Sequence, residues 1–307
     1  MLDLPSSPLQ KIKLDLPYEL YIKRDDLLHP LISGNKWRKL KYNIEAIKDH
    51  QKTIFVTKGG NYSNHIYATA AAGKVFNFRT IGLIRGERVD NATLRFAAAQ
   101  GMELIFCNRN DYRNINEDNF GDFISSHIQD TNTQDVHFLP EGGTNTLALL
   151  GSAEIVTEIT AQLPDLDWSK TVLATAVGTG GTLAGMINGA AGRGHLLGIA
   201  TLKGDFLARE VSQLCDTAHK NWSISNDFHF GGYARWTPEL IDFIRGMEQA
   251  YDLPLDPIYT SKLFFALFDM MQNRTISEDS IIIAIHTGGL QGRIGFEEQH
   301  GISFSGL

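Results

Sequence analysis

The sequence predicts an α/β protein with mostly parallel sheets flanked by helices. Short apolar runs rich in β-branched residues alternate along the chain with longer amphipathic stretches. Runs this short and this apolar are typical of strands buried on both faces, and their alternation with helices favours parallel pairing. Glycine clusters follow four of these runs, at the strand ends where open parallel sheets bind their ligands.

The elements are expected in a regular order along the chain. Strands are predicted at residues 53–57, 79–84, 103–106, 136–139, 171–177, 196–201 and 280–285. Helices are predicted at residues 65–74, 91–100, 147–162, 182–191, 238–250 and 261–273. Residues 108–134 are rich in Asn and Asp, and we interpret them as a loop and a surface helix.

The composition excludes several classes of protein. Hydrophobic residues make up 43% of the 307 residues and charged residues 21%, which indicates a packed globular chain. The net charge of −7 argues against a nucleic-acid partner, and the lack of a long apolar run argues against a membrane span. Two distant cysteines, Cys107 and Cys215, and the absence of a signal-peptide pattern predict a cytoplasmic protein with buried thiols.

The glycine cluster after the strand at 171–177 predicts a phosphate site. A helix is expected directly after the cluster, so several backbone N–H groups and a positive helix end surround one spot. The pattern is not a P-loop, and Leu183 stands where a dinucleotide fingerprint requires its third glycine. An ordinary tight turn is the alternative. The residues concerned are Gly178, Thr179, Gly180, Gly181 and Thr182.

A second cluster, Gly59-Gly60, precedes a polar helix start. Asn61, Ser63 and Asn64 can each cap a helix, but one cap does not account for all three side chains together with the two glycines. Free backbone N–H groups at such a helix start would suit a carboxylate.

A lysine would complete the chemistry that these clusters indicate. A phosphate nest together with a lysine that forms a Schiff base is the minimum set of groups for pyridoxal phosphate. Lys36 has an unusual context, directly after Gly34-Asn35. Residue chemistry alone does not select it over Lys23, Lys58 or Lys262, and a solvated side chain is the ordinary expectation for any lysine.

Seven ordered blocks run almost from end to end of the chain. They are Lys23-Arg24-Asp25-Asp26, Gly34-Asn35-Lys36-x-Arg38-Lys39-Leu40, Gly59-Gly60-x-x-Ser63-Asn64-His65, Pro140-Glu141-Gly142-Gly143-x-Asn145, Gly178-Thr179-Gly180-Gly181-Thr182, Asp256-Pro257-Ile258-Tyr259-Thr260-Ser261-Lys262 and His286-Thr287-Gly288-Gly289. In these blocks the sequence resembles the 1-aminocyclopropane-1-carboxylate deaminase/D-cysteine desulfhydrase family of fold-type II pyridoxal-phosphate enzymes. The match is specific because all seven blocks occur in order.

The resemblance implies a particular organisation. The fold would be a two-domain α/β structure similar to the tryptophan synthase β subunit, with pyridoxal phosphate in the cleft between the domains. Residues 1–40 and 155–307 would form the large cofactor-binding domain, and residues 41–154 a small α/β domain. The resemblance also implies a homodimer.

The resemblance assigns cofactor roles to matched residues. Lys36 would form the Schiff base and remove the substrate α-proton, and Asn64 would hydrogen-bond the cofactor's phenolic oxygen. Thr260 and Thr287 would lie near the pyridine nitrogen. The phosphate would be held by Gly178, Thr179, Gly180, Gly181 and Thr182.

The resemblance assigns substrate roles to a second group. Ser63, with the N–H groups around Asn64 and His65, would bind the substrate carboxylate and assist proton transfer. Tyr233 and Tyr259 would line the substrate side of the cofactor and take part in catalysis. Without the resemblance, both tyrosines would be interpreted as core aromatics with satisfied hydroxyls.

Position 260 separates two reactions within the family. Ring-opening deaminases resemble the pattern Asp-Pro-x-Tyr-Glu-Gly-Lys, whose glutamate helps to hold the pyridine nitrogen protonated. Here Thr260 takes that place, and Thr287 stands where the deaminase pattern has an apolar residue. A neutral threonine leaves the cofactor a weaker electron sink, which suits a substrate with a good leaving group. We therefore expect α,β-elimination, with D-cysteine giving pyruvate, hydrogen sulfide and ammonia.

Several alternatives stay open. The bulky Tyr62 beside the carboxylate site leaves chloroalanine, cysteate and D-serine as other β-substituted substrates. Ring-opening deamination is the alternative within the family. Alternatives of another class are a dinucleotide-dependent oxidoreductase and a ligand-binding homologue without activity. No metal site is expected, because none of the ten histidines has a metal-binding spacing.

Overall fold

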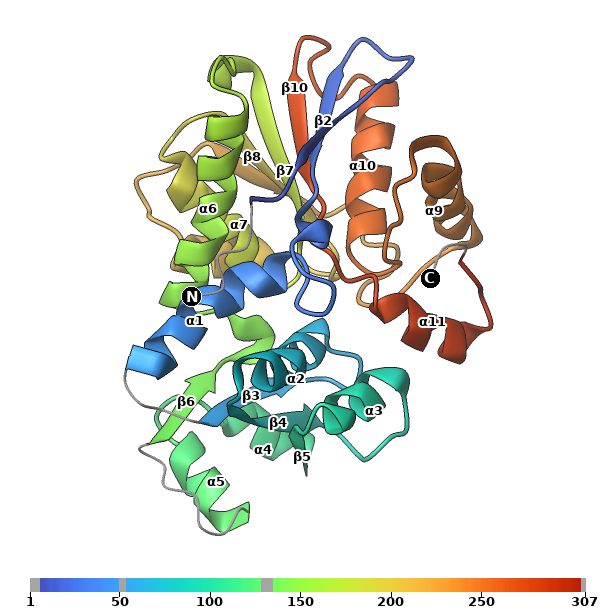
Figure 1. Ribbon diagram of the computed structural model, residues 1–307. Helices are drawn as coiled ribbons and strands as arrows, with labels where there is room; N and C mark the ends of the chain where they lie inside the picture. Colours follow the sequence, from blue (N-terminus) through green and yellow to red (C-terminus); the bar gives the residue numbers. More distant parts are fainter. Residues whose placement is uncertain (1–5, 50–53, 128–134, 305–307) are drawn as a thin grey trace.

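The computed structural model describes residues 6–49, 54–127 and 135–304, which form two sheets with helices around them (Figure 1). Within these residues the larger sheet has the strand order β1-β2-β10-β7-β8-β9 and the smaller sheet the order β5-β4-β3-β6. Neighbouring strands are parallel except in the β1–β2 pair. The expected fold class, α/β with mostly parallel sheets flanked by helices, is confirmed.

Each predicted strand has a counterpart, although residue 53 lies outside the described residues. The larger sheet contains β1 (Leu9–Ile12), β2 (Glu19–Lys23), β7 (Thr171–Val177), β8 (His195–Ala200), β9 (Trp222–Ser225) and β10 (Ile281–Ile285). The smaller sheet contains β3 (Ile54–Gly59), β4 (Arg79–Arg85), β5 (Glu103–Cys107) and β6 (Val136–Leu139). Strands β1, β2 and β9 have no counterpart among the predictions, because they lie at or next to the sheet edges and lack a continuous apolar run.

The predicted helices correspond to α2 (Asn64–Phe76), α3 (Ala92–Ala99), α6 (Thr146–Gln162), α7 (Gly181–Ala190), α9 (Pro238–Tyr251) and α10 (Thr260–Gln272). The polar segment at 108–134 contains α4 (Arg109–Asn114) and α5 (Phe120–His127), and its last seven residues lie outside the described part. Helices outside the predictions are α1 (Asn35–Asp49), α8 (Leu207–Leu214) and α11 (Gly292–His300).

Helices cover both faces of the larger sheet, and β7 shows why its residues form a buried strand. Leu173 and Val177 face the core formed with α6, α7 and α8. Ala174 and Ala176 face the opposite core, formed with α9 and α10. Because successive side chains of a strand point to opposite faces, a strand between two helix layers buries both of its faces, and β7 is accordingly apolar at most of its positions.

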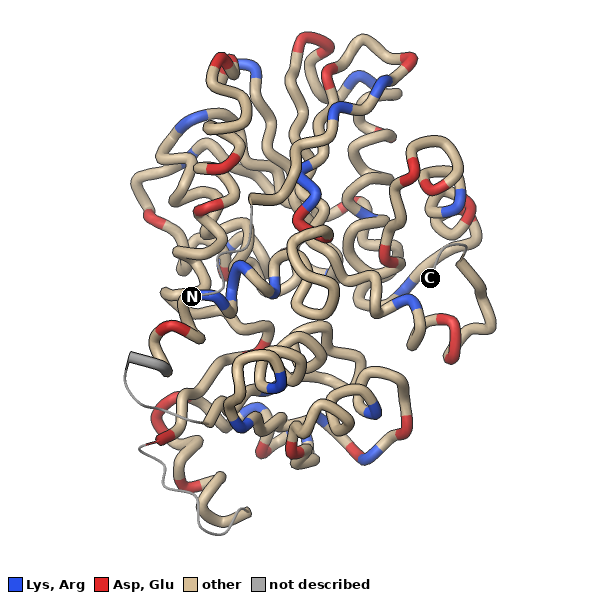
Figure 2. Tube along the Cα trace, in the orientation of Figure 1, with Lys and Arg blue, Asp and Glu red and all other residues tan. Residues whose placement is uncertain are grey.

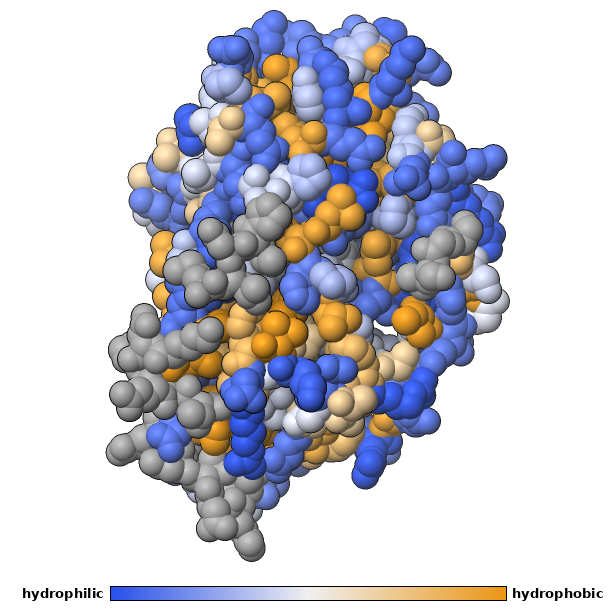
Figure 3. All heavy atoms as spheres, viewed as in Figure 1, coloured by the Kyte–Doolittle hydropathy of each residue, from blue (hydrophilic) through white to orange (hydrophobic). Residues whose placement is uncertain are grey.

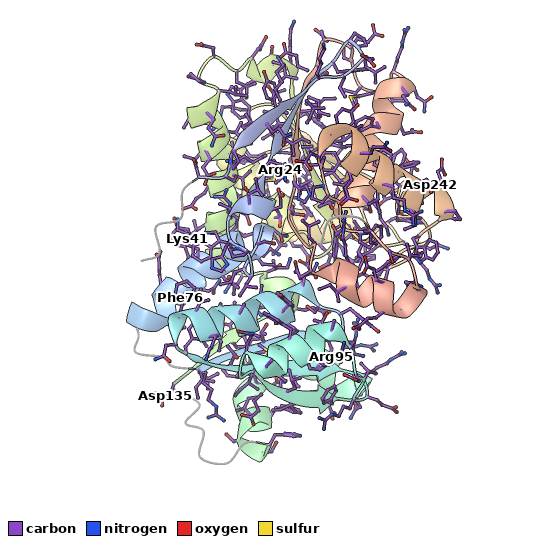
Figure 4. All side chains as sticks on the ribbon, turned by 45° about the vertical axis from the view of Figure 1, so that its right-hand side comes forward. Arg24, Lys41, Phe76, Arg95, Asp135 and Asp242 are labelled. Atoms are coloured by element: carbon purple, nitrogen blue, oxygen red, sulfur yellow. The ribbon has the colours of Figure 1, made fainter. Side chains whose placement is uncertain are left out.

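Helix α1 connects the two parts of the molecule, one built on the larger sheet and the other on the smaller sheet. It packs against α6 beside the larger sheet, and its Trp37 stacks on Phe76 with 6.1 Å between the ring centroids. Phe76 is labelled at the end of α2 in Figure 4. Hydrophobic side chains also gather across the middle of the face in Figure 3, where the two parts meet. The predicted domain limits at 40/41 and 154/155 fall inside α1 and α6, and these limits stay a prediction.

A cluster of buried charges fixes α1 to the larger sheet. Arg38 donates to both oxygens of Asp25 at 2.8 and 3.1 Å and to Glu158 of α6 at 2.9 Å. Lys23 of β2 donates to the same glutamate at 2.6 Å. Figure 2 shows the basic residues of α1 at the centre of the molecule. This cluster sets the position of the helix whose first turn carries Lys36.

None of the helices in the described ranges is long and apolar enough to cross a membrane. Cys107 and Cys215 are both free and buried, as predicted.

Candidate active site

A cavity of about 710 Å³ lies between the two parts of the chain. Its wall is formed by the loops that follow β3, β6, β7 and β10, together with the first turn of α1. The carboxyl ends of strands from both sheets therefore face one space, which is where parallel sheets place their ligands. Among the predicted site residues, those on the wall are Lys36, Ser63, Asn64, His65, Gly178, Thr179, Gly180, Gly181, Thr182, Tyr233, Tyr259 and Thr287.

Lys36 lies at the start of α1 and points its amine into this cavity. Its Nζ donates to the side chain of Asn35 at 2.9 Å, and Asn35 in turn donates to Thr182 at 3.0 Å. Burial lowers the pKa of Lys36 to about 8, although the charge of Asp256 opposes the shift. A substantial fraction of the Lys36 amine is therefore neutral near neutral pH, as a nucleophile or base requires.

The other three candidate lysines are engaged elsewhere. Lys23 pairs with Glu158, and Lys58 donates to the carbonyl of Ile115 at 2.7 Å. Lys262 donates to the carbonyls of His229 and Gly232 at 2.9 and 2.8 Å. None of the three lines the cavity. The fold thus separates Lys36 from candidates that residue chemistry could not distinguish.

Lys39 is a cavity residue that the sequence analysis assigned no role. Its Nζ lies 3.0 Å from the carbonyl of Gly142, 3.0 Å from Oγ1 of Thr144 and 3.4 Å from Oγ1 of Thr179. Burial, followed by the charge of Lys36, holds its pKa well below the usual range for lysine. A sequence signal existed, because residues three apart on a helix lie on the same face.

The loop from Gly178 to Thr182 forms a cradle of bare backbone at the start of α7. Gly180 has a φ of +79°, a conformation that favours glycine. A Cβ at Gly181 would lie 2.7 Å from Thr144 and 3.1 Å from Nζ of Lys39, so a side chain would fill the space between the loop and that ammonium. Backbone N–H groups, a helix N-terminus and a lysine converge on this space, as an anion site requires.

Ser63 is the N-cap of α2. Its Oγ accepts from the backbone N–H groups of His65 and Ile66 at 3.2 and 3.3 Å, so the capping interpretation holds for this residue. The hydroxyl proton of Ser63 has no acceptor among the described residues and can be donated into the cavity. The N–H of His65, which was expected to bind the substrate carboxylate, is already engaged by this cap.

His65 has a defined tautomer. The Thr57 hydroxyl donates to the carbonyl of Leu139 at 3.1 Å, so it must accept from Nε2 of His65, which lies 2.8 Å away. Nδ1 is therefore unprotonated, and it has no partner in the described structure. Burial, followed by the charges of Lys36 and Lys39, holds the His65 pKa well below the usual range, which keeps the ring neutral.

Tyr233 and Tyr259 lie together on one side of the cavity. Their ring centroids are 6.4 Å apart in an edge-on arrangement. Burial raises the pKa of Tyr259 well above the ordinary value, and burial also raises that of Tyr233. Tyr233 is 44% exposed, so it is not the core aromatic that its sequence would suggest without the family resemblance. Both hydroxyls stay protonated at neutral pH and are able to donate.

The two threonines predicted near the pyridine nitrogen have different surroundings. Thr287 lines the cavity. Thr260 is fully buried at the first residue of α10 and is not part of the cavity wall. Its hydroxyl donates to Oδ1 of Asp256 at 2.6 Å. Its role beside the pyridine nitrogen stays a prediction.

Comparison with known proteins gives this geometry a family. Residues 4–288 match the family described as "pyridoxal-phosphate dependent enzyme". The chain belongs to the pyridoxal-phosphate dependent enzyme family. Its cofactor is pyridoxal phosphate, and its fold is the fold-type II architecture of that family.

Relatives within the family carry two activities in their names. A Thermotoga maritima protein named putative 1-aminocyclopropane-1-carboxylate deaminase is 30% identical, over 94% of each chain. A mitochondrial protein of Arabidopsis thaliana, named bifunctional D-cysteine desulfhydrase/1-aminocyclopropane-1-carboxylate deaminase, is 29% identical over 89% of this chain and 73% of its own. A D-cysteine desulfhydrase of Salmonella newport is 26% identical over 93% and 91%.

A solved structure supports the same family assignment. The crystal structure of an ACC deaminase homologue superimposes with a TM-score of 0.75 at 25% identity, over 96% of this chain and 93% of that one. The expected family, the 1-aminocyclopropane-1-carboxylate deaminase/D-cysteine desulfhydrase family, is confirmed.

The residues present fit the family's cofactor. The cradle at residues 178–182, with Lys39 behind it, offers a site for the phosphate. The Lys36 amine, with its lowered pKa, offers the nucleophile that the cofactor aldehyde needs. His65 lines the same cavity, and its buried Nδ1 has no partner among the described residues, which fits a wall that accepts a polar ligand. Among the described residues no group of His, Cys, Asp or Glu side chains could hold a metal ion.

Proposed function

We propose that the protein catalyses α,β-elimination from a β-substituted amino acid, with D-cysteine giving pyruvate, hydrogen sulfide and ammonia. The observation that carries this proposal is the chemistry around position 260. Thr260 is neutral, and the nearby Asp256 carboxylate already accepts from the backbone N–H groups of residues 258, 259 and 260 and from the Thr260 hydroxyl. No carboxylate is left there to hold a pyridine nitrogen protonated, which favours a substrate that brings its own leaving group.

The chain's own residues divide the work of this reaction. Bound pyridoxal phosphate supplies the electron sink for the pair left at Cα. Lys36 removes the α-proton, because its lowered pKa gives it a neutral amine near neutral pH. Ser63 donates its free hydroxyl proton to the substrate carboxylate at the start of α2. Tyr233 and Tyr259 face the β-substituent as proton donors.

The cofactor roles follow the same division. Asn64 would hydrogen-bond the phenolic oxygen of the cofactor, and the cradle from Gly178 to Thr182 would hold the phosphate together with Lys39; all of them line the cavity. Thr287, in the loop after β10, would donate to the pyridine nitrogen. We also propose that the protein acts on a small amino acid in the cytoplasm, which agrees with its two free thiols, and that it forms a homodimer, as the family resemblance implies.

Ring-opening deamination is the second candidate, because relatives from Thermotoga maritima and Arabidopsis thaliana carry that activity in their names. The same purified protein distinguishes the two reactions. Ring opening of 1-aminocyclopropane-1-carboxylate gives 2-oxobutanoate and ammonia, whereas elimination from D-cysteine gives pyruvate and sulfide. Sulfide release with little 2-oxobutanoate supports elimination, and the reverse result overturns it.

The decisive test compares Lys36→Ala with Lys74→Ala, which removes an exposed lysine from α2. Lys36→Ala should abolish the visible absorption of bound cofactor and the release of pyruvate and sulfide from D-cysteine. Lys74→Ala should retain both. In the wild-type protein, the rate of cofactor incorporation should rise with pH up to about 8 and then level, because only the neutral amine reacts. Full activity in Lys36→Ala would refute the assignment.

A further inference from the structure

Arg85 is a cation in the cavity wall that the proposed function does not use. It is the last residue of β4, and its side chain lines the cavity beside the loop that leads into α2. A Cβ at Gly60 would lie 3.6 Å from its Nη2, so the guanidinium is in van der Waals reach of that loop. Its Cζ also lies 5.5 Å from the centre of the Tyr112 ring, which holds the guanidinium on one side.

The hydrogen-bonding capacity of Arg85 is almost unused. Its closest charged partner is Glu141, with 3.8 Å between Nη1 and Oε1, and both side chains are about half exposed (48% and 46%). This distance is too long for a hydrogen bond. No hydrogen bond joins the guanidinium to the residues that the structure describes. A planar fork with free donors therefore faces the cavity, and such a fork matches carboxylate, sulfonate and similar anions.

The two other anions of the reaction already have sites. The phosphate cradle has its own lysine, Lys39, and the substrate carboxylate has the Ser63 cap. Arg85 lines the same cavity as Tyr233 and Tyr259. With the phosphate and the substrate carboxylate placed elsewhere, the β-substituent is the remaining group for the guanidinium.

We propose that Arg85 binds the β-substituent of the substrate, and that the preferred substrates carry a negative charge there, as a thiolate or a sulfonate does. This inference rests on the elimination reaction proposed above. Lys36 takes the proton from Cα, the Cβ–X bond breaks, and the group X leaves with the bonding electron pair. A sulfonate leaves as sulfite, and a thiolate leaves as hydrosulfide with a proton donated by the tyrosine pair. In both cases the electron pair of the breaking bond adds negative charge to X in the transition state. A fixed cation beside X therefore stabilises the transition state more than the bound substrate.

Glu141 is the counterion that the substituent displaces. Its carboxylate lies 3.8 Å from Arg85 and competes with an incoming anion for the same guanidinium. Replacing Arg85 and replacing Glu141 should therefore have opposite effects on an anionic ligand. A merely structural pair would instead give two changes in the same direction.

Binding of aspartate and alanine to the cofactor-loaded protein tests this directly. Aspartate carries a carboxylate on Cβ that is not a leaving group, and alanine carries only hydrogen. Dissociation constants of both enantiomers are measured by calorimetry for wild type, Arg85→Met and Glu141→Gln. The matched control is Arg79→Met, because Arg79 lies at the other end of the same strand, is similarly exposed and pairs with Glu103 at 2.9 Å.

The expected result is a change in preference rather than in overall binding. Arg85→Met should weaken aspartate roughly tenfold relative to alanine, as expected for loss of a charged hydrogen-bond partner at a half-exposed site. Glu141→Gln should shift the ratio the other way, and Arg79→Met should leave it unchanged. Equal weakening of both ligands by Arg85→Met, or loss of cofactor, overturns the inference.

Turnover then separates this inference from the proposed function. Wild type should release sulfite from cysteate and chloride from β-chloroalanine, and Arg85→Met should lower kcat/KM selectively for cysteate. If no amino acid undergoes elimination but the aspartate preference still depends on Arg85, the reaction is wrong and the anion site stands. If elimination proceeds with the same cysteate preference in both proteins, the reaction stands and the anion site is wrong.

Discussion

The hydroxyl of Thr260 donates to the carboxylate of Asp256, with 2.6 Å between Oγ1 and Oδ1. The same hydroxyl accepts from the backbone N–H of Asp256 at 2.8 Å. A threonine hydroxyl has one proton, so Thr260 has none left to donate to a pyridine nitrogen. With these two bonds Thr260, the first residue of α10, closes the turn from Asp256 that carries Tyr259. Thr287 lines the cavity, and we propose its hydroxyl as the donor for that nitrogen.

Thr260→Val should therefore affect stability more than the cofactor. The isosteric change leaves the buried backbone N–H of Asp256 without a partner and removes one of the two hydrogen bonds that its Oδ1 accepts, which costs about 1–3 kcal/mol in the free energy of unfolding. Thr260→Ser keeps the hydroxyl and should lose much less. Urea unfolding measures the free energy of unfolding of both Thr260 variants.

Thr287→Val should instead alter the absorption spectrum of the bound cofactor at little cost in stability. A spectral change in Thr260→Val equal to that of Thr287→Val would contradict this division.

Gly34→Ala should push the loop that carries Thr287 away from the start of α1 and so disrupt the cavity wall beside Lys36. Gly34 has a φ of +62°, and a Cβ there would lie 1.8 Å from the carbonyl oxygen of Thr287. That contact is with backbone, so the loop carrying Thr287 would have to move away from α1. Gly301→Ala is the control, because Gly301 has a φ of +65° but no atom within 4 Å of its Cβ position. Backbone strain alone costs about 1 kcal/mol.

Cofactor titration and thermal unfolding distinguish the two variants. Gly301→Ala should be slightly less stable and should bind cofactor normally. Gly34→Ala should lose cofactor binding even where it remains folded. Normal cofactor affinity in Gly34→Ala would mean that the loop tolerates the displacement and that the close approach of Gly34 to Thr287 is not required.

Arg38→Ala should be among the most destabilising single changes in the chain. The Arg38 side chain is 2% exposed and that of Asp25 is fully buried, so removing the guanidinium leaves a buried carboxylate unpaired. Breaking such a pair costs about 3–5 kcal/mol. Arg245→Ala, which removes a half-exposed arginine paired with Asp242 on α9, should cost well under about 1 kcal/mol. Urea unfolding compares them, and equal midpoints would show that the buried cluster contributes no stability.

The parts of the fold that could be predicted from the sequence are those that bury mainly apolar side chains. Strands β7, β8 and β10 lie between helix layers, so their continuous apolar runs were visible in the sequence. Helix α1 was not predicted, although Leu40, Ile44 and Ile47 repeat at helical spacing and are buried in one core cluster. The same helix also buries Arg38, Lys39 and Asn43, whose partners lie far away in the sequence. These polar residues between the apolar positions obscure the helical period.

The same limit applies to the cavity. Glycine clusters and the family blocks located its loops, because those features are local in sequence. Lys39 and Arg85 were not assigned, since each is significant only through partners that the fold brings together from other loops. The separation of Thr260 from the cavity wall also depends on one hydrogen bond to Asp256, which no residue pattern specifies.

His65→Gln should change how stability depends on pH. The folded-state pKa of His65 is held well below its usual value, first by burial and then by Lys36 and Lys39, so the folded ring stays neutral. The unfolded chain binds a proton to this histidine below about pH 6.5, and the folded chain does not. Since the unfolded state then binds more protons, this residue makes stability fall as pH decreases below about 6.5, with a slope of up to about 1.4 kcal/mol per pH unit.

Glutamine at position 65 keeps a donor for Thr57 but cannot titrate. Urea unfolding of the cofactor-free protein at several pH values should show wild type losing stability faster than His65→Gln towards acid. His127→Gln, at an exposed position of α5, should follow wild type. Parallel curves for wild type and His65→Gln would show that His65 takes up a proton in the folded protein, and would refute the neutral tautomer that its bond to Thr57 defines.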